Sequence, residues 1–184
     1  ISITSAKGFL LVVKAPKKLK KRANKMIIMG NTCLYGATGG ELFAEGIAGE
    51  RFGVRNSGCK AVIEGSGDHA CEYMTGGSVV VLGNTGNNFG AGMTGGLAFV
   101  YDKNRLFKNK INMQSVEIQS PIDSQYKKHQ NYLLNLLKSH YKETGSLVTK
   151  EIIKNFKEEI GNFMMVKPKD SDFKDLLMIL TKAA

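Results

Sequence analysis

A glycine-rich string is the first stretch whose residue types could do chemistry. Gly90, Gly92 and Gly95 lie in GAGMTG, which matches the G-x-G-x-x-G fingerprint of dinucleotide-binding folds. That fingerprint holds a pyrophosphate on free N–H groups at a helix N-terminus, so a helix has to follow it. Here an apolar run from Leu97 to Tyr101 follows and predicts a strand. We therefore interpret the match as a by-product of the glycine spacing, not as a nucleotide site.

A polar string, GSGDHACE, holds Ser66, Asp68, His69 and Glu72 and could suggest a hydrolase. A nucleophilic serine of that class sits in a G-x-S-x-G elbow between a strand and a helix. Glu64 stands where the first glycine of that elbow would be. The sequence therefore favours polar groups at a turn and predicts no catalytic residue.

The three cysteines, Cys33, Cys59 and Cys71, show no C-x-x-C spacing. His69 with two of them gives only three candidate ligands, whereas a zinc site needs about four. Cys33 and Cys71 are two repeat periods apart, which places them about 9.6 Å from each other in stacked coils. A disulfide forms only where the two Cα atoms are within roughly 7 Å of each other. The sequence predicts free thiols, a reducing compartment and no metal site.

The charge is strongly positive but unevenly distributed. The chain has 26 Lys and Arg against 16 Asp and Glu, a formal net charge of +10. Seven of the positive residues lie between residues 14 and 25, and such a run can mark a nucleic-acid interface. No aromatic residues interleave to stack on bases, so we favour a solvated basic loop. A basic nucleic-acid-binding module remains the alternative from another class. No run approaches the roughly 18 apolar residues of a membrane helix.

A glycine that returns at a constant step of nineteen positions organises the centre of the chain: Gly39, Gly58, Gly77 and Gly96. A short apolar run follows each of them. Superposing the runs on this step gives apolar columns, of which Leu42, Ala61, Val80 and Phe99 form the first. Self-similarity at a short fixed period indicates coils that bury their apolar faces by stacking.

These coils predict a mainly β fold, a single-stranded right-handed parallel β-helix with an α-helical C-terminal tail. Each recurring glycine is expected at a coil corner, where glycine reaches a positive φ without a Cβ clash. Runs upstream of the glycines (CLYGA, RFGV, ACEY and NFGAG) are expected to be a second short strand in each coil. A leucine-rich repeat is excluded because its L-x-x-L-x-L frame is missing. A hexapeptide helix is excluded because nineteen is not a multiple of six.

The predicted organisation has three parts. Residues 1–102 form the β-helix, with incomplete first coils and a basic loop at 14–25. Residues 103–121 form a linker or extended segment, and residues 122–184 form a helical tail packed on the β-helix. Helices are predicted from Asp123 or Ser124 to Gly145, from Ser146 or Thr149 to Ile160, and over 171–182, with a strand at 163–166. Because the chain begins at Ile1, we expect a piece of a longer protein, whose uncovered β-helix end could self-associate.

The string GNTCLYGATGGELFAEGIAGERFGVRNSG, with GDHACEYMTGG and NFGAGMTGG, resembles the C-terminal, GXGXG-repeat domain of the glutamate synthase large subunit. The resemblance is close over residues 24–102 and looser to the end. Residues 14–25 depart from it, because a short proline-containing turn would be expected there. The glycine repeat also resembles a β-helix subunit of formylmethanofuran dehydrogenase, which is the second choice.

The resemblance implies a scaffold beside the amidotransferase and FMN-binding domains of one polypeptide, the latter with an iron–sulfur cluster. Together these make glutamate from glutamine and 2-oxoglutarate with NAD(P)H or ferredoxin. No catalytic, cofactor or metal residue of the family falls on this chain, so it is expected to be a fragment of an oxidoreductase that is inactive alone. It is expected in the cytoplasm or in an organelle such as a plastid. Residues near coil edges are candidate contacts with the other domains: Arg51, Arg55, Asp68, His69 and Glu72.

Overall fold

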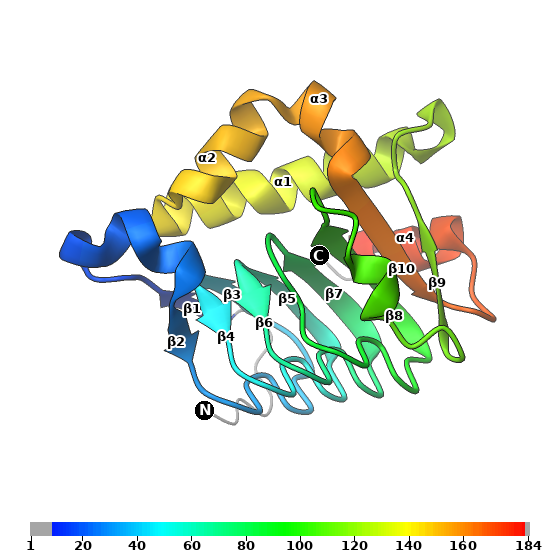
Figure 1. The fold of residues 1–184 in the computed structure, drawn as a ribbon. Coiled ribbons are helices and arrows are strands. Elements are labelled where there is room, and N and C mark those ends of the chain that lie inside the picture. Colours follow the sequence, from blue (N-terminus) through cyan, green and yellow to red (C-terminus); the bar gives the residue numbers. More distant parts are fainter. Residues whose placement is uncertain (1–8, 183–184) are drawn as a thin grey trace.

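The fold is a β-solenoid of about four turns, carried by two sheets in which the strands of successive coils pair in parallel. The computed structural model describes residues 9–182. Figure 1 shows the coils stacked side by side, with the C-terminal helices covering one face. The larger sheet has seven strands in spatial order: β1 (Leu10–Val13), β3 (Glu41–Ala44), β5 (Ser57–Ile63), β7 (Thr75–Val81), β8 (Gly95–Tyr101), β10 (Phe163–Pro168) and β9 (Val116–Gln119).

A second, three-stranded sheet forms another side of the coils. It contains β2 (Ile27–Met29), β4 (Ile47–Ala48) and β6 (Gly65–Ser66). Both pairings in it are parallel, as are those of the larger sheet from β1 to β8. The predicted fold class, a mainly β parallel solenoid with a helical tail, is therefore confirmed.

The third side of each coil is made of turns, which we call the turn column: residues 32–36, 51–55, 69–73 and 88–92. Every second residue there has a positive φ, for example Arg51, Gly53 and Arg55 at 58°, 68° and 55°. Backbone bonds join successive coils, as where Cys71 N–H donates to Phe52 O at 2.8 Å. Such alternation cannot form strands, so the prediction of a second strand at the upstream runs was wrong. In the coils of β1, β3 and β5, the second strand lies after the first, in the three-stranded sheet.

The strand register shows that the coils are not all of equal length. Lys60 pairs on one side with Glu41, which is a full repeat step before it in the sequence. On its other side Lys60 pairs with Ser78, which is one position short of a full step, whereas Ser78 and Leu97 are again a full step apart. The predicted apolar columns therefore hold between the first two strands and slip by one position at the third, where Val79 aligns with Ala61.

Adjacent glycines explain why the period still looked constant. Glycine pairs lie just before β3, at 39–40, and within the first residues of β7 and β8, at 76–77 and 95–96. The glycine at the constant step is the first of the pair at 39–40 but the second of the pairs at 76–77 and 95–96. This shift by one position compensates for the shorter coil, so the spacing of the glycines stays constant. Register shifts in β5 and β7 accompany these glycines.

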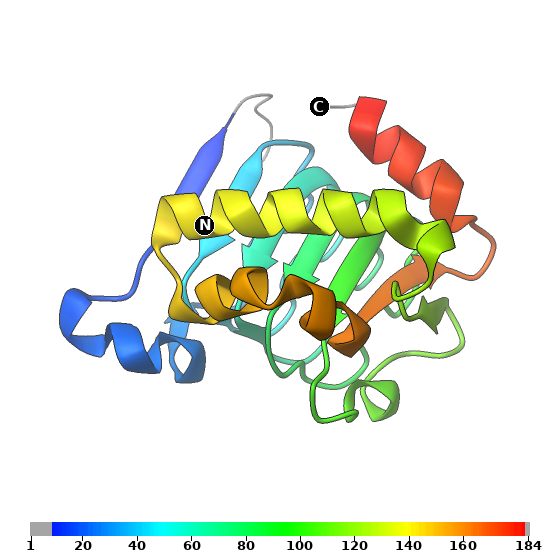
Figure 2. The same cartoon turned by 90° about the horizontal axis from the view of Figure 1, so that it is seen from above.

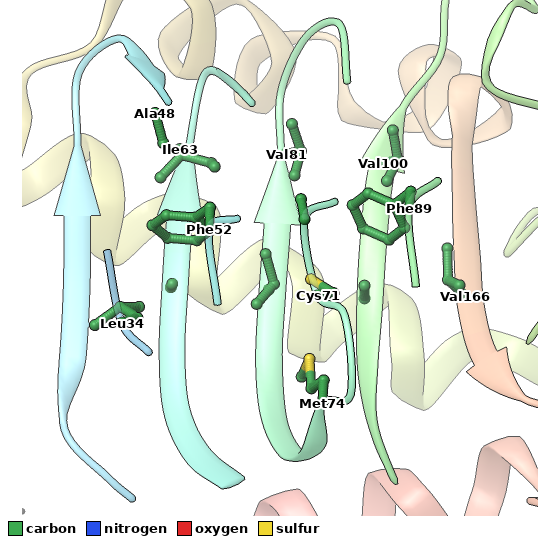
Figure 3. Packing of buried hydrophobic residues seen from close by; sticks show 14 of the residues in the cluster. Leu34, Ala48, Phe52, Ile63, Cys71, Met74, Val81, Phe89, Val100 and Val166 are labelled. Carbon is green, nitrogen blue, oxygen red and sulfur yellow. The ribbon is translucent and has the colours of Figure 1, made fainter. Parts of the chain in front are cut away.

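The interior of the coils is filled by apolar side chains from all three sides. Figure 3 shows Leu34, Phe52 and Phe89 from the turn column facing Ile63 and Val100 from the larger sheet. All five are at most 1% exposed. Burial on this scale, at about 25 cal/mol per Å² of apolar surface, is the main force that holds the coils together.

Helices cover the outer face of the larger sheet. Figure 2 shows α1 (Lys127–Thr144) crossing its strands, with α4 (Phe173–Lys182) near the β8 end. A second apolar cluster, including Phe43, Phe99 and Leu137, fills the space between the sheet and the helices. The remaining helices are short: η1 (Lys17–Lys25), η2 (Phe107–Asn109), η3 (Ser124–Tyr126), α2 (Leu147–Lys154), α3 (Phe156–Glu159) and η4 (Ile160–Asn162).

The helix ends follow local sequence signals. Gly145 ends α1 with a left-handed φ of 71°, as predicted. Ser146 begins α2, and its hydroxyl oxygen accepts a hydrogen bond from Thr149 N–H at 3.1 Å. The second predicted helix is interrupted at Asn155, so α2 and α3 replace a single helix.

Two segments differ from the expected organisation. The basic stretch expected to be a loop forms the 3-10 helix η1, whose Lys20 donates to Thr144 O at 3.1 Å. The tail is not helical throughout, because β10 pairs antiparallel with β8 and so ends the run of parallel strands. β9, within the expected linker, then pairs with β10.

Candidate functional site

The glycine string GAGMTG lies in the turn column and leads into a strand. Gly90 and Gly92 have positive φ values of 72° and 65°, and β8 begins at Gly95. The N–H groups of both glycines are occupied, by Ala70 O at 2.9 Å and by Ser115 Oγ at 2.9 Å. These donors are therefore occupied within the fold, and the strand predicted after the string is present as β8.

The candidate contact residues come together on the outside of the turn column. Arg51 N–H donates to Asp68 O at 2.8 Å, and Arg55 N–H donates to Glu72 O at 2.9 Å. His69 Nδ1 lies 3.6 Å from Glu72 Oε1. Both arginine side chains are exposed. These five residues, from two different coils, thus form one polar face.

The recurring glycines serve two different purposes. Gly77 and Gly96 have positive φ values of 74° and 81°. Gly39 and Gly58 do not have a positive φ, so the predicted corner conformation was wrong at these two positions. A Cβ at Gly58 would nevertheless collide with the backbone carbonyl of Thr38 in the previous coil. Glycine is needed at Gly77 and Gly96 for both the backbone conformation and the close approach of two coils, and at Gly58 for the close approach alone.

The cysteines are free, and two of them are buried in the core. Burial raises the pKa of the Cys59 thiol to about 12 and raises that of Cys71 as well. The thiolate is the reactive form, so these two side chains are inert packing groups. No group of three or more potential metal ligands occurs among residues 9–182.

A buried pair of carboxylates is a feature that the sequence reasoning missed. Glu45 and Glu64 are 1% and 2% exposed, and both line a cavity of about 230 Å³ between η1, α2 and the coil edges. Ser146 donates its hydroxyl hydrogen to Glu64 Oε1. Burial, opposed by this hydrogen bond and assisted by the charge of Glu45, raises the pKa of Glu64 to about 7. The detectable signal was the repeated Glu–Gly at the end of two successive apolar runs, AEG and IEG.

A buried histidine lies beside this pair. His140 Nε2 donates to Ala44 O at 3.1 Å, and Nδ1 accepts from the Thr149 hydroxyl at 2.7 Å. Burial lowers the pKa of His140 to about 4. With both nitrogens occupied and no charge at neutral pH, His140 joins α1 and α2 to the solenoid and is not placed to transfer protons.

Another cavity, of about 520 Å³, lies between the ends of β7 and β8 and the segment after β8. Tyr101, Lys103 and Phe107 are among its lining residues. The Asp102 carboxylate beside it is occupied by the N–H groups of Leu106 and Phe107, at 2.9 and 3.1 Å. None of the helices in the described part of the chain has the length and apolar character needed to span a membrane.

Comparison with known proteins identifies the relatives of the chain. It is 44% identical over 173 residues to a ferredoxin-dependent glutamate synthase from Antithamnion sp., covering 94% of this chain and 11% of that protein. It is 48% identical over 161 residues to the ferredoxin-dependent glutamate synthase of Pyropia yezoensis, covering 88% and 10%. It is 46% identical over 163 residues to a glutamate synthase [NADH] of Schizosaccharomyces pombe, covering 89% and 8%.

These matches confirm the resemblance to a glutamate synthase GXGXG-repeat domain and favour it over formylmethanofuran dehydrogenase. The chain spans about a tenth of the length of the curated relatives it matches. A family model described as GXGXG motif matches residues 4–169, which include the whole solenoid and most of the tail. The chain therefore belongs to the GXGXG motif family.

Proposed function

We propose that this chain is a structural and assembly domain of a glutamate synthase and has no turnover of its own. The observation that carries the proposal is the solenoid interior, which is packed with apolar side chains from three sides. Such a stack is a rigid spacer that can hold other domains at fixed positions. The short span of the match within the relatives supports a role as one part of a larger polypeptide.

The partners in this proposal are the amidotransferase and FMN-binding domains of the same polypeptide. FMN and the iron–sulfur cluster would belong to those domains. The polar face formed by Arg51, Arg55, Asp68, His69 and Glu72 is proposed as the contact, because its exposed charges lie on rigid turns whose backbone groups are already paired. Rigid presentation lowers the entropy cost of docking.

Activity measurements test whether the chain has turnover of its own. We expect the purified chain to show no glutamine- and 2-oxoglutarate-dependent oxidation of NADH, NADPH or reduced ferredoxin, whereas the full protein is active with one of these donors. Both donor classes are included because the relatives' names mention ferredoxin and NADH. Turnover by the chain alone would refute the scaffold role.

A charge reversal tests the contact face. In the full protein, the double substitution Arg51→Glu and Arg55→Glu should lower the yield of glutamate per glutamine hydrolysed, because the two catalytic domains lose their alignment. Lys154→Glu with Lys157→Glu, two exposed residues of α2 and α3, is the matched control and should leave the yield unchanged. Equal yields in both double variants would exclude this face as the contact.

A further inference from the structure

The cavity of about 230 Å³ described above contains more negative than positive charge. We call it the carboxylate pocket; its charged lining residues are Lys20, Lys21, Glu45, Glu64 and Glu151. Glu45 and Glu64 are almost completely buried, whereas Lys21 and Glu151 are exposed at the rim. The two rim charges have opposite sign and are solvated, so the net charge inside the pocket depends on Glu45, Glu64 and Lys20.

The contacts of the two carboxylates leave one oxygen without a charged or hydrogen-bonding partner. Glu45 Oε2 accepts from Ala15 N–H at 3.3 Å, and Glu45 Oε1 lies 3.4 Å from Lys20 Nζ. Glu64 Oε1 accepts from the Ser146 hydroxyl. Glu64 Oε2 is buried and has no hydrogen-bond partner among the described residues. Leaving a buried carboxylate oxygen without a partner destabilises the folded state, so the position of this oxygen at a cavity wall is informative.

The charge balance indicates what would satisfy this oxygen. Above about pH 7, where Glu64 is ionised, two carboxylates opposed by one ammonium leave a net charge of −1 in a buried place, which is unfavourable unless a further positive charge enters. A divalent ion would leave a net positive charge beside Lys20 and would have few ligands, since groups of three or more potential ligand side chains are not found in the described part of the chain. One compact monovalent cation would bring the net charge of the pocket to zero.

We propose that the carboxylate pocket binds one compact monovalent cation, held by Glu64 Oε2 and the Glu45 carboxylate. The ligand class includes hydrated potassium and ammonium. When it is bound, the cation links the edges of two coils to η1 and α2, because Glu45 and Glu64 come from the coils and the walls come from the helices. The basic segment then has a structural purpose, which is to close the pocket and bring Lys20 to Glu45.

Local hydrogen exchange in the full protein tests the proposal without requiring the chain to fold alone. Exchange is followed by mass spectrometry in peptides that cover residues 41–48, 60–67 and 144–150, at pH 8 and equal ionic strength. The salts are potassium, ammonium, sodium and choline chloride at about 0.1 M, which screens surface charges equally. Exchange in potassium or ammonium should be slower than in choline, by about tenfold if the concentration is ten times Kd.

The variants Glu64→Gln and Glu158→Gln complete the test. Glu64→Gln removes the charge that holds the cation, so its exchange should be the same in all four salts. Glu158 is exposed on α3, and its variant should keep the full cation response. Equal exchange of the unsubstituted protein in choline and in the other three salts would overturn the proposal. If protection instead increases on acidification, alike in every salt, a proton alone neutralises Glu64, and the proposal is also overturned.

Discussion

At the scale of single residues, two properties decide what a position tolerates in this solenoid: the backbone conformation and the space left by the neighbouring coil. Gly77 combines both limits, with a φ of 74° and a Cβ position that meets the Cys59 carbonyl. Gly58 has only the second limit. Gly30 has neither, because nothing lies within 4 Å of its Cβ position and its φ is not positive. The same residue type therefore has very different costs of replacement.

Gly58→Val and Gly77→Val should each destabilise the protein by several kcal/mol. At Gly77, strain at a positive φ accounts for roughly 1–3 kcal/mol and the collision with the Cys59 carbonyl adds to it, whereas at Gly58 the collision with the Thr38 carbonyl acts alone. Denaturant unfolding of each variant measures the loss. Gly30→Ala is the control and should change stability by less than about 0.5 kcal/mol. Unchanged melting of Gly77→Val would contradict the need for glycine at this place.

Glu64 and His140 are expected to affect stability with opposite pH dependence. Glu64 keeps its proton to about pH 7 when folded, whereas its ordinary pKa is 4.5, so its contribution to stability falls as pH rises from 4.5 to 7. His140 resists protonation down to about pH 4, so stability falls as pH drops from 6.5 to 4. Between pH 4.5 and 6.5 the two effects oppose each other.

Glu64→Gln should therefore be more stable than the unsubstituted protein at pH 8, by up to roughly 3 kcal/mol in choline salts, and nearly equal at pH 4.5. Glutamine keeps an oxygen that accepts from Ser146 but has no charge to bury. Below pH 6.5 the variant should lose stability more steeply, because His140 is no longer opposed. Chemical denaturation from pH 4 to 8 checks this. Parallel pH profiles for the two proteins would contradict the raised pKa of Glu64.

At the scale of elements, α1 is the main link between the tail and the solenoid. Its buried residues include Leu133 and Leu137, which pack with Phe43 and Phe99 of the larger sheet. The antiparallel strand β10 adds a second link, since it pairs with β8 from Phe163 to Val166. The tail therefore shares both the larger sheet and an apolar cluster with the solenoid.

Leu137→Ala should destabilise the protein by about 2–5 kcal/mol, because a fully buried leucine is replaced by a cavity between the helix and the sheet. Lys138→Ala on the exposed side of the same helix should change stability by less than about 0.5 kcal/mol. Thermal unfolding of both variants provides the comparison. A small effect of Leu137→Ala would show that the helix is only loosely attached.

At the scale of the whole molecule, the net charge of +10 is concentrated near one end of the solenoid. η1 carries six of the basic residues, and Lys20 is already engaged with Glu45 and Thr144. β1 and β2 are edge strands at this end, and Leu10 and Ile27 are 48% and 71% exposed. Exposed apolar edges favour association, so self-association through this end stays a prediction.

Generic DNA should bind the protein only weakly at about 0.15 M salt, because the basic segment offers few phosphate contacts and no aromatic platform. Fluorescence anisotropy with a random duplex at several salt concentrations measures this. Lys17→Glu with Lys21→Glu should leave the affinity unchanged within error. Tight binding with a steep salt dependence that the double variant removes would revive the nucleic-acid alternative.

Local sequence patterns predicted much of this architecture. The glycine repeat and the apolar runs predicted a parallel solenoid, and Gly145 and Ser146 predicted helix ends, because these signals depend on φ preferences and on burial of nearby residues. Asp68, His69 and Glu72 of the polar string GSGDHACE lie with Arg51 and Arg55 on one face. The prediction of a loop for the lysine-rich segment was wrong, because its helix is stabilised by contacts with residues far away in the sequence, such as Thr144.

The sequence by itself determined that the chain would coil into stacked, apolar-filled turns, since a repeat carries its own packing information. Only the tertiary structure decided the one shorter coil, the pairing of β10 with β8 and the meeting of Glu45, Glu64 and Lys20. Each of these depends on which distant segments fit against the edge of the stack, and a short repeat does not specify that. The carboxylate pocket therefore became visible only when η1 and α2 were seen to close over the coil edges.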